Sequence, residues 1–177
     1  MLTRRTFILA GVAGAAALVT AGWLRNTRSV PADNGAAERP PALDPDADAV
    51  LTAVVPVFLV GALPPGEDAA RHAVRATIAA VGTAIAGLPP AAQRELAQLF
   101  SLLGFAPARM TLARVTPGWR EAPSAEVVAF LTRWRDSDFL MFRSAYAALH
   151  QLVFAAWYGN PAAWPAIGYP GPPWLST

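Results

Sequence analysis

The chain has 177 residues, enough for one domain of modest size once terminal segments are set aside. It contains no Cys, which excludes disulfides, thiolate catalysis and Cys-ligated metal centres within the chain. The formal charge is +2, but four of the 14 Arg precede Val30, and the remainder carries ten Arg against 12 Asp and Glu, a net charge of −2. Acids and bases are interspersed there, so no basic surface for a nucleic acid is expected.

The N-terminus has the layout of a signal peptide. Arg4 and Arg5 precede a long apolar stretch rich in Ala and Gly. Together with Phe7 and Ile8 they are similar to the twin-arginine motif, whose pathway exports proteins that have already folded. We therefore predict a twin-arginine signal peptide over residues 1–24 and a periplasmic location. An ordinary secretory leader, or retention of the apolar stretch as a membrane anchor, are the alternatives.

Three further segments are expected after the leader. Residues 25–43 are polar and show no periodic apolar pattern, which is typical of a linker. A helical domain is predicted over 44–159, and a tail rich in Pro, Gly and aromatic residues over 160–177. No segment shows sustained polar–apolar alternation with a period of two. The predicted fold is therefore all-α, a bundle of about five helices followed by an irregular tail.

The first helix of the domain has clear start signals. Asp44 is a good N-cap and Pro45 suits the first helical position. The apolar residues of 49–63 cover most of the helix circumference, but this segment would rise only about 22 Å, short of the roughly 30 Å of a bilayer core. A central buried helix is therefore preferred to a membrane segment.

Two amphipathic helices are predicted next. Gly87 ends the first of them, Pro89 and Pro90 open the second, and Gly104 is expected to cap its C-terminus. The apolar stripes are Val74, Ile78, Val81 and Ile85 in the first helix, and Leu96, Leu99, Phe100 and Leu103 in the second.

A long connection is predicted over 105–123, because this segment carries three prolines. One helical turn is expected at 110–114, and Trp119 is expected to attach the connection to the core. Ser124 is predicted to be the N-cap of a helix over 125–135.

The longest predicted helix covers 138–158. Its apolar residues follow the helical period, and three stop signals, Gly159, Asn160 and Pro161, come directly after it.

Residues with catalytic potential do not converge in the sequence. His72 and His150 lie in different predicted helices without a short spacing to carboxylates, so His150 is interpreted as a structural residue or a partner contact. No Gly-x-Ser-x-Gly motif is present. The acids Asp136 and Asp138 are expected at a helix cap and on a solvated face, beside Arg133, Arg135 and Arg143. We predict no catalytic, metal-binding or cofactor-binding residues and no enzymatic activity for this chain alone.

The most unusual stretch lies at the C-terminus, where Trp and Tyr alternate with Gly and Pro. Aromatic side chains on a stiff, irregular backbone suit docking into a partner, because Trp and Tyr dominate interface energetics. The alternative is that the tail folds back over the bundle. The predicted partner-binding residues are Trp157, Tyr158, Gly159, Asn160, Trp164, Ile167, Gly168, Tyr169, Pro170 and Gly171.

These motifs resemble those of a known family. Arg4-Arg5-x-Phe7, Tyr158-Gly159-Asn160, Trp164 and the run Ile167 to Gly171 are similar to motifs in the small subunits of membrane-associated flavin-dependent sugar and polyol dehydrogenases, the gluconate 2-dehydrogenase subunit 3 type. Members of that family often have two glycines where this chain has Gly159 alone.

The resemblance implies a non-catalytic accessory subunit. Such a subunit holds no cofactor and escorts a folded flavoprotein of the glucose-methanol-choline type, which carries FAD, through the twin-arginine translocase. A cytochrome c subunit completes some of these complexes. The alternative function is an independent periplasmic or membrane-tethered helical binding protein.

Overall fold

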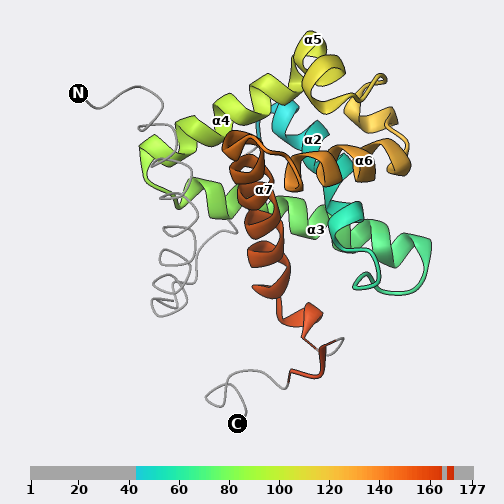
Figure 1. Cartoon of the computed structure of the whole chain (residues 1–177). Helices are drawn as coiled ribbons and strands as arrows, with labels where there is room; N and C mark the ends of the chain where they lie inside the picture. The colour runs from blue at the N-terminus through green and yellow to red at the C-terminus, as the bar shows by residue number, and fades with distance from the viewer. Residues whose placement is uncertain (1–42, 165–166, 170–177) are drawn as a thin grey trace.

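The computed structural model describes residues 43–164 and 167–169, which form a helical bundle (Figure 1). Its five longer helices are α2 (Pro45–Phe58), α3 (Glu67–Ala86), α4 (Pro90–Gly104), α6 (Ser124–Arg135) and α7 (Leu140–Tyr158). The short elements are α5 (Ala106–Ala108), the π-helix η1 (Arg109–Ala113) and the 3₁₀-helices η2 (Trp119–Glu121) and η3 (Pro161–Ala163). The described residues contain no strand, and the predicted all-α class is confirmed.

The first helix of the domain, α2, lies at the centre of the bundle. It begins as predicted: Asp44 Oδ1 accepts a hydrogen bond from the Asp46 amide at 2.9 Å, and Pro45 is the first helical residue. It contacts α3, α4, α6, α7 and η2. Because α2 is contacted on all sides, its apolar residues do not form a single stripe. The buried residues of α2 are Ala47, Val50, Leu51, Val54 and Val55.

The helices α3 and α4 pack against α2 through one face each. Gly87 is the C-cap of α3 and Pro90 is the first residue of α4, as predicted. The buried residues of α4 are Ala92, Leu96, Phe100 and Leu103. No single helix of the described residues is long and apolar enough to cross a membrane; one bent pair, α4 with Ala106–Ala113 at 76°, passes that test by length and composition alone.

The role predicted for Gly104 is wrong. Gly104 is the last residue of α4, and Phe105 is the C-cap. A Cβ atom at Gly104 would overlap the carboxylate of Asp46, in the first turn of α2. The N-terminus of α2 thus packs directly on the C-terminal turn of α4, and a larger residue at position 104 would displace the Asp46 side chain.

The connection after α4 is more helical than predicted, with α5 and η1 together covering residues 106–113. Trp119 attaches it to the core: its side chain is buried, packs on Phe130 at 5.3 Å between ring centroids, and donates from Nε1 to the Leu103 carbonyl at 2.7 Å. Leu103 belongs to the last turn of α4, whose carbonyls have no partner within the helix. The indole thus satisfies a buried helix end.

Two predicted helix starts differ from the structure. Ser124 is the first residue of α6, after Pro123 at the N-cap position, and no side-chain capping hydrogen bond is present. The last helix begins at Leu140, two residues later than predicted, because a turn precedes it. In that turn Ser137 Oγ accepts a hydrogen bond from the Phe139 amide at 3.2 Å, and Arg143 donates to the Ser137 carbonyl.

We expect Gly104→Ala to lower the free energy of unfolding by about 1 kcal/mol, because the added methyl group forces the Asp46 side chain out of its place. Chemical denaturation measures this change. Adding Asp46→Ala to Gly104→Ala should recover most of the loss. Gly118→Ala is the matched control, because the side chain that it would displace, Glu121, is exposed, whereas Asp46 is half-buried. Equal effects of the two glycine variants would contradict the close approach of α2 and α4.

Candidate partner-binding site

A column of ring side chains follows one face of α7. Tyr146, His150, Phe154 and Tyr158 are spaced by four residues, which places them above one another on a helix. Phe58, the last residue of α2, packs against the first three of them. We call these five residues the aromatic column.

The rings of the column are in continuous contact. The closest pair is His150 and Phe154, with centroids 4.4 Å apart, and Phe154 stacks on Tyr158 at 5.8 Å and 29°. Phe58 meets His150 edge-on at 5.4 Å and 89°. Edge-to-face and offset contacts are the favourable arrangements for rings at these distances. The column therefore continues the ordered core to the C-terminal end of α7.

The tail continues this series beyond the helix. Trp164 Nε1 donates to the Tyr158 carbonyl at 2.8 Å, so the indole holds the last turn of α7. Asn160 Oδ1 accepts a hydrogen bond from the Ala162 amide at 3.0 Å and thereby starts η3. The Tyr169 amide donates to the Trp164 carbonyl at 3.1 Å, and the two rings meet at 5.3 Å.

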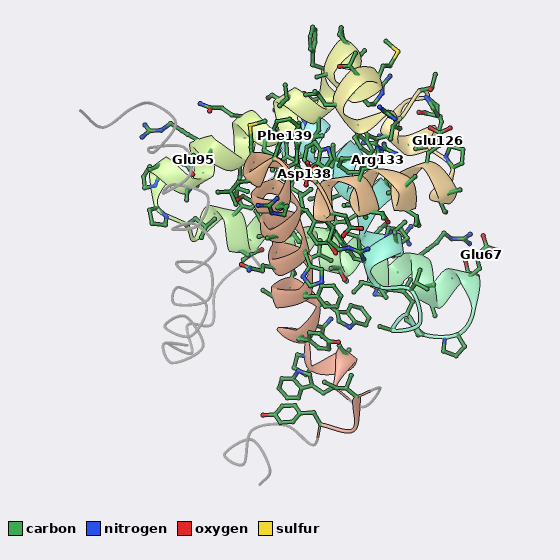
Figure 2. All side chains as sticks on the ribbon, viewed as in Figure 1. Glu67, Glu95, Glu126, Arg133, Asp138 and Phe139 are labelled. Atoms are coloured by element: carbon green, nitrogen blue, oxygen red, sulfur yellow. The ribbon has the colours of Figure 1, made fainter. Side chains whose placement is uncertain are left out.

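The described part of the tail forms a compact turn with its own contacts. Gly168, which has φ of 68°, takes the left-handed conformation that glycine adopts readily. In Figures 1 and 2 this segment extends from the end of α7 away from the other helices.

Apolar area remains accessible at this end of the molecule. The exposed fractions are 37% for Tyr158, 53% for Ile167 and 45% for Tyr169, whereas Trp164 is half-buried. We call Tyr158, Trp164, Ile167 and Tyr169 the tail surface. Ordered aromatic side chains that stay partly exposed are the kind of group that anchors a protein interface.

The structure separates one predicted partner-binding residue from the others. Trp157 is only 6% exposed and belongs to the core, so we leave it out of the tail surface. Gly159 and Asn160 end α7 and start η3, and therefore shape the surface through the backbone. The remaining predicted residues lie outside the described part: Arg4, Arg5, Phe7, Ile8, Pro170 and Gly171.

Sequence reasoning missed most of the aromatic column. Tyr146 and Phe58 were recognisable only as apolar helix residues, and Phe154 was not singled out. The recurrence of rings every four residues in α7 was a detectable signal. The packing of Phe58 against these rings was not detectable, because Phe58 belongs to a helix about ninety residues earlier in the chain.

Polar residues with catalytic potential are engaged in structural contacts. Arg135 pairs with Asp136 at 2.8 Å, and its hydrogen bond lowers the pKa of that carboxyl group. Arg133 donates to the Ala113 carbonyl, and Arg143 to the Ser137 carbonyl. Within the described residues, no group of three or more His, Asp or Glu could hold a metal ion.

His150 is the titratable member of the column. Burial lowers its pKa from the ordinary value of 6.5, because the surrounding rings cannot solvate an imidazolium ion. The neutral imidazole is therefore the form that the folded protein favours.

Comparison with protein-family models, curated proteins and solved structures gives no match for this chain.

We expect the stability of the protein to fall as the pH drops below about 6.5. Because the pKa of His150 is lower in the folded than in the unfolded chain, the unfolded state binds a proton first and gains free energy. Denaturation midpoints measured between pH 7.5 and 5.0 should fall less steeply for His150→Phe than for the wild type. His72→Phe is the matched control, because it removes an exposed histidine outside the column. Equal slopes for both variants would show that the column does not disfavour imidazolium.

Proposed function

We propose that this chain is a non-catalytic accessory subunit that escorts a folded FAD-dependent dehydrogenase through the twin-arginine route and stabilises it in the periplasm. The partner is a flavoprotein of the glucose-methanol-choline type and supplies the FAD. A cytochrome c subunit is a further candidate component of the complex.

The tail surface is the observation that carries this proposal. The Trp164 indole donates to the Tyr158 carbonyl and the Tyr169 amide to the Trp164 carbonyl, and yet about half of the Ile167 and Tyr169 side chains stays exposed. Pre-ordering of apolar groups reduces the entropy cost of binding, so such a surface favours association with another protein. The aromatic column connects it to the core, which gives the docking end a rigid support.

The leader supplies the second argument. The pair Arg4-Arg5 with Phe7 resembles a twin-arginine motif, and that pathway is used for proteins that must fold before export. A dehydrogenase that loads FAD in the cytoplasm has this requirement. A leader on a bound small subunit would serve the whole complex.

Export is tested by replacing Arg4 and Arg5 with Lys in a strain that expresses the neighbouring genes. We expect both this chain and its flavoprotein partner to remain in the cytoplasm, measured by fractionation and by the flavin absorbance of each fraction. Normal export of the two proteins would contradict the twin-arginine route.

Association is tested with an affinity tag inserted in the linker 25–43, so that neither the leader nor the tail is altered. The wild type should co-purify with a larger protein that absorbs as a flavin. The double variant Ile167→Ala and Tyr169→Ala should bind that protein about 30-fold more weakly, because exposed anchors of an interface contribute about 2 kcal/mol together.

Val128→Ala is the matched control for this variant. Val128 is an aliphatic side chain on α6 with an exposure close to that of Ile167, but it lies outside the tail surface. Circular dichroism should give the same helical signal for all three proteins. A colourless, solitary wild-type protein would instead favour the independent binding module.

A further inference from the structure

A second exposed apolar surface lies where the chain bends after α4. Phe105 and Met110 are 61% and 48% exposed, and Leu102 and Leu112 are exposed beside them. We call residues 102–114 the elbow. The elbow includes α5, which Figure 1 shows at one extremity of the molecule, far from the tail. Figure 2 shows side chains extending outward from this tip.

Hydrogen bonds from two tryptophans and within η1 hold the backbone of the elbow in the fold. Trp119 holds the Leu103 carbonyl from inside, and Trp134 Nε1 donates to the Leu112 carbonyl at 3.3 Å. The Val115 amide donates to the Arg109 carbonyl at 3.2 Å and closes η1. These contacts fix the inner side of the elbow while its apolar side chains face water.

The charges of the elbow are positive. Residues 96–119 contain Arg109 and Arg114 and no Asp or Glu. Neither arginine forms a salt bridge with another described residue. Arg133 adjoins them through the Ala113 carbonyl, and its pKa is lowered by burial and by the charge of Arg114.

Two carboxylates lie at the edges of this surface. Asp46 packs beside Gly104, and Glu126 accepts a hydrogen bond from the Thr116 amide at 3.2 Å. Neither is part of the tip around α5. The tip therefore combines exposed apolar side chains with uncompensated arginines, the combination that binds an anionic membrane surface.

The point at which the chain enters the domain also favours a membrane as the partner of the elbow. The described residues begin at Leu43, and the first turn of α2 packs on the last turn of α4 through Asp46 and Gly104. The 42 preceding residues, which include the long apolar run of the leader, therefore join the domain beside the elbow. If the leader is retained as a membrane anchor, the linker of residues 25–42 tethers the elbow to that membrane within at most about 60 Å.

We propose that the elbow inserts Phe105, Met110 and Leu112 into the surface of an anionic lipid bilayer, with Arg109 and Arg114 at the level of the headgroups. The surface is a protruding tip, which suits insertion between lipids better than the flat contact of a stable dimer, about 800 Å² on each copy. This site is separate from the tail surface, so the domain could contact a membrane at one end and a protein at the other.

The absence of Cys makes a site-specific test possible, because one introduced thiol is unique in the chain. We would label Met110→Cys in the full chain with a fluorophore whose emission shifts to the blue in apolar surroundings. Glu67→Cys, at the exposed start of α3, is the matched control, and Figure 2 shows Glu67 well away from the tip at α5. Vesicles of phosphatidylcholine with 30% phosphatidylglycerol are compared with phosphatidylcholine alone. The apolar leader is expected to bind lipid as well, so binding of the chain to vesicles does not by itself test the elbow. The measurement is therefore the polarity of the surroundings of each label.

We expect the label at residue 110 to shift to the blue and to be quenched by spin-labelled lipid in the anionic vesicles, while the label at residue 67 stays in water. Arg114→Asn, which suits the left-handed φ of 53° at this position, should lower the ratio of inserted to water-exposed label about fivefold. Circular dichroism checks the fold, and Leu112→Cys provides a second labelling site if Met110→Cys is poorly folded.

Three results would overturn the proposal. The label at residue 110 could stay water-exposed on vesicles to which the chain is bound, or it could shift equally on neutral vesicles. It could also shift without vesicles, either with protein concentration, which would assign the elbow to a second copy, or on addition of the flavoprotein, which would assign it to that partner.

Discussion

The burial of α2 on all sides is the constraint on which the rest of the structure depends. This helix contacts each of the other long helices, so its apolar residues supply a surface to every one of them. Burial of apolar area is the main favourable term in folding, and here one helix contributes to most of the interfaces. Its two ends also position both exposed surfaces: the first turn packs on Gly104 beside the elbow, and Phe58 packs in the aromatic column.

Aromatic contacts and indole hydrogen bonds complete the packing where helices end. Trp119, Trp134 and Trp164 each donate to a backbone carbonyl at or beyond a helix terminus. Helix ends leave carbonyls without partners, and a buried carbonyl without a hydrogen bond is costly. A large ring with one donor can cover such an end with apolar area and satisfy it at the same time. The connection after α4 and the start of the tail are therefore ordered although they contain several prolines.

The tail surface and the elbow lie at different ends of the molecule. In the tail surface, the Trp164 side chain donates to the Tyr158 carbonyl and contacts the Tyr169 ring, and Tyr158 stacks on the aromatic column. In the elbow, Trp119 and Trp134 hold backbone carbonyls from the inside, and the exposed apolar side chains are accompanied by arginines. The arginines of the elbow are the physical reason for assigning the elbow to a lipid surface and the tail surface to a protein.

Local rules accounted for the fold class and for many helix boundaries. Asp44 with Pro45, Gly87, Pro90 and Gly159 mark helix ends through hydrogen bonds and backbone angles within one turn of the chain. Such signals can be read from a few adjacent residues. The apolar period of each helix likewise indicated which face is buried, and it correctly identified α2 as central.

The sequence by itself therefore determined the all-α class, the number of long helices and the character of the aromatic tail. Only the tertiary structure decided that Trp157 is part of the core while Tyr158, its neighbour, stays exposed, and that Phe58 joins the column on α7. It also decided that Gly104 lies against the Asp46 side chain. These outcomes depend on contacts between residues far apart in the chain, whose geometry follows from the packing of whole helices and is not encoded in any short stretch of sequence.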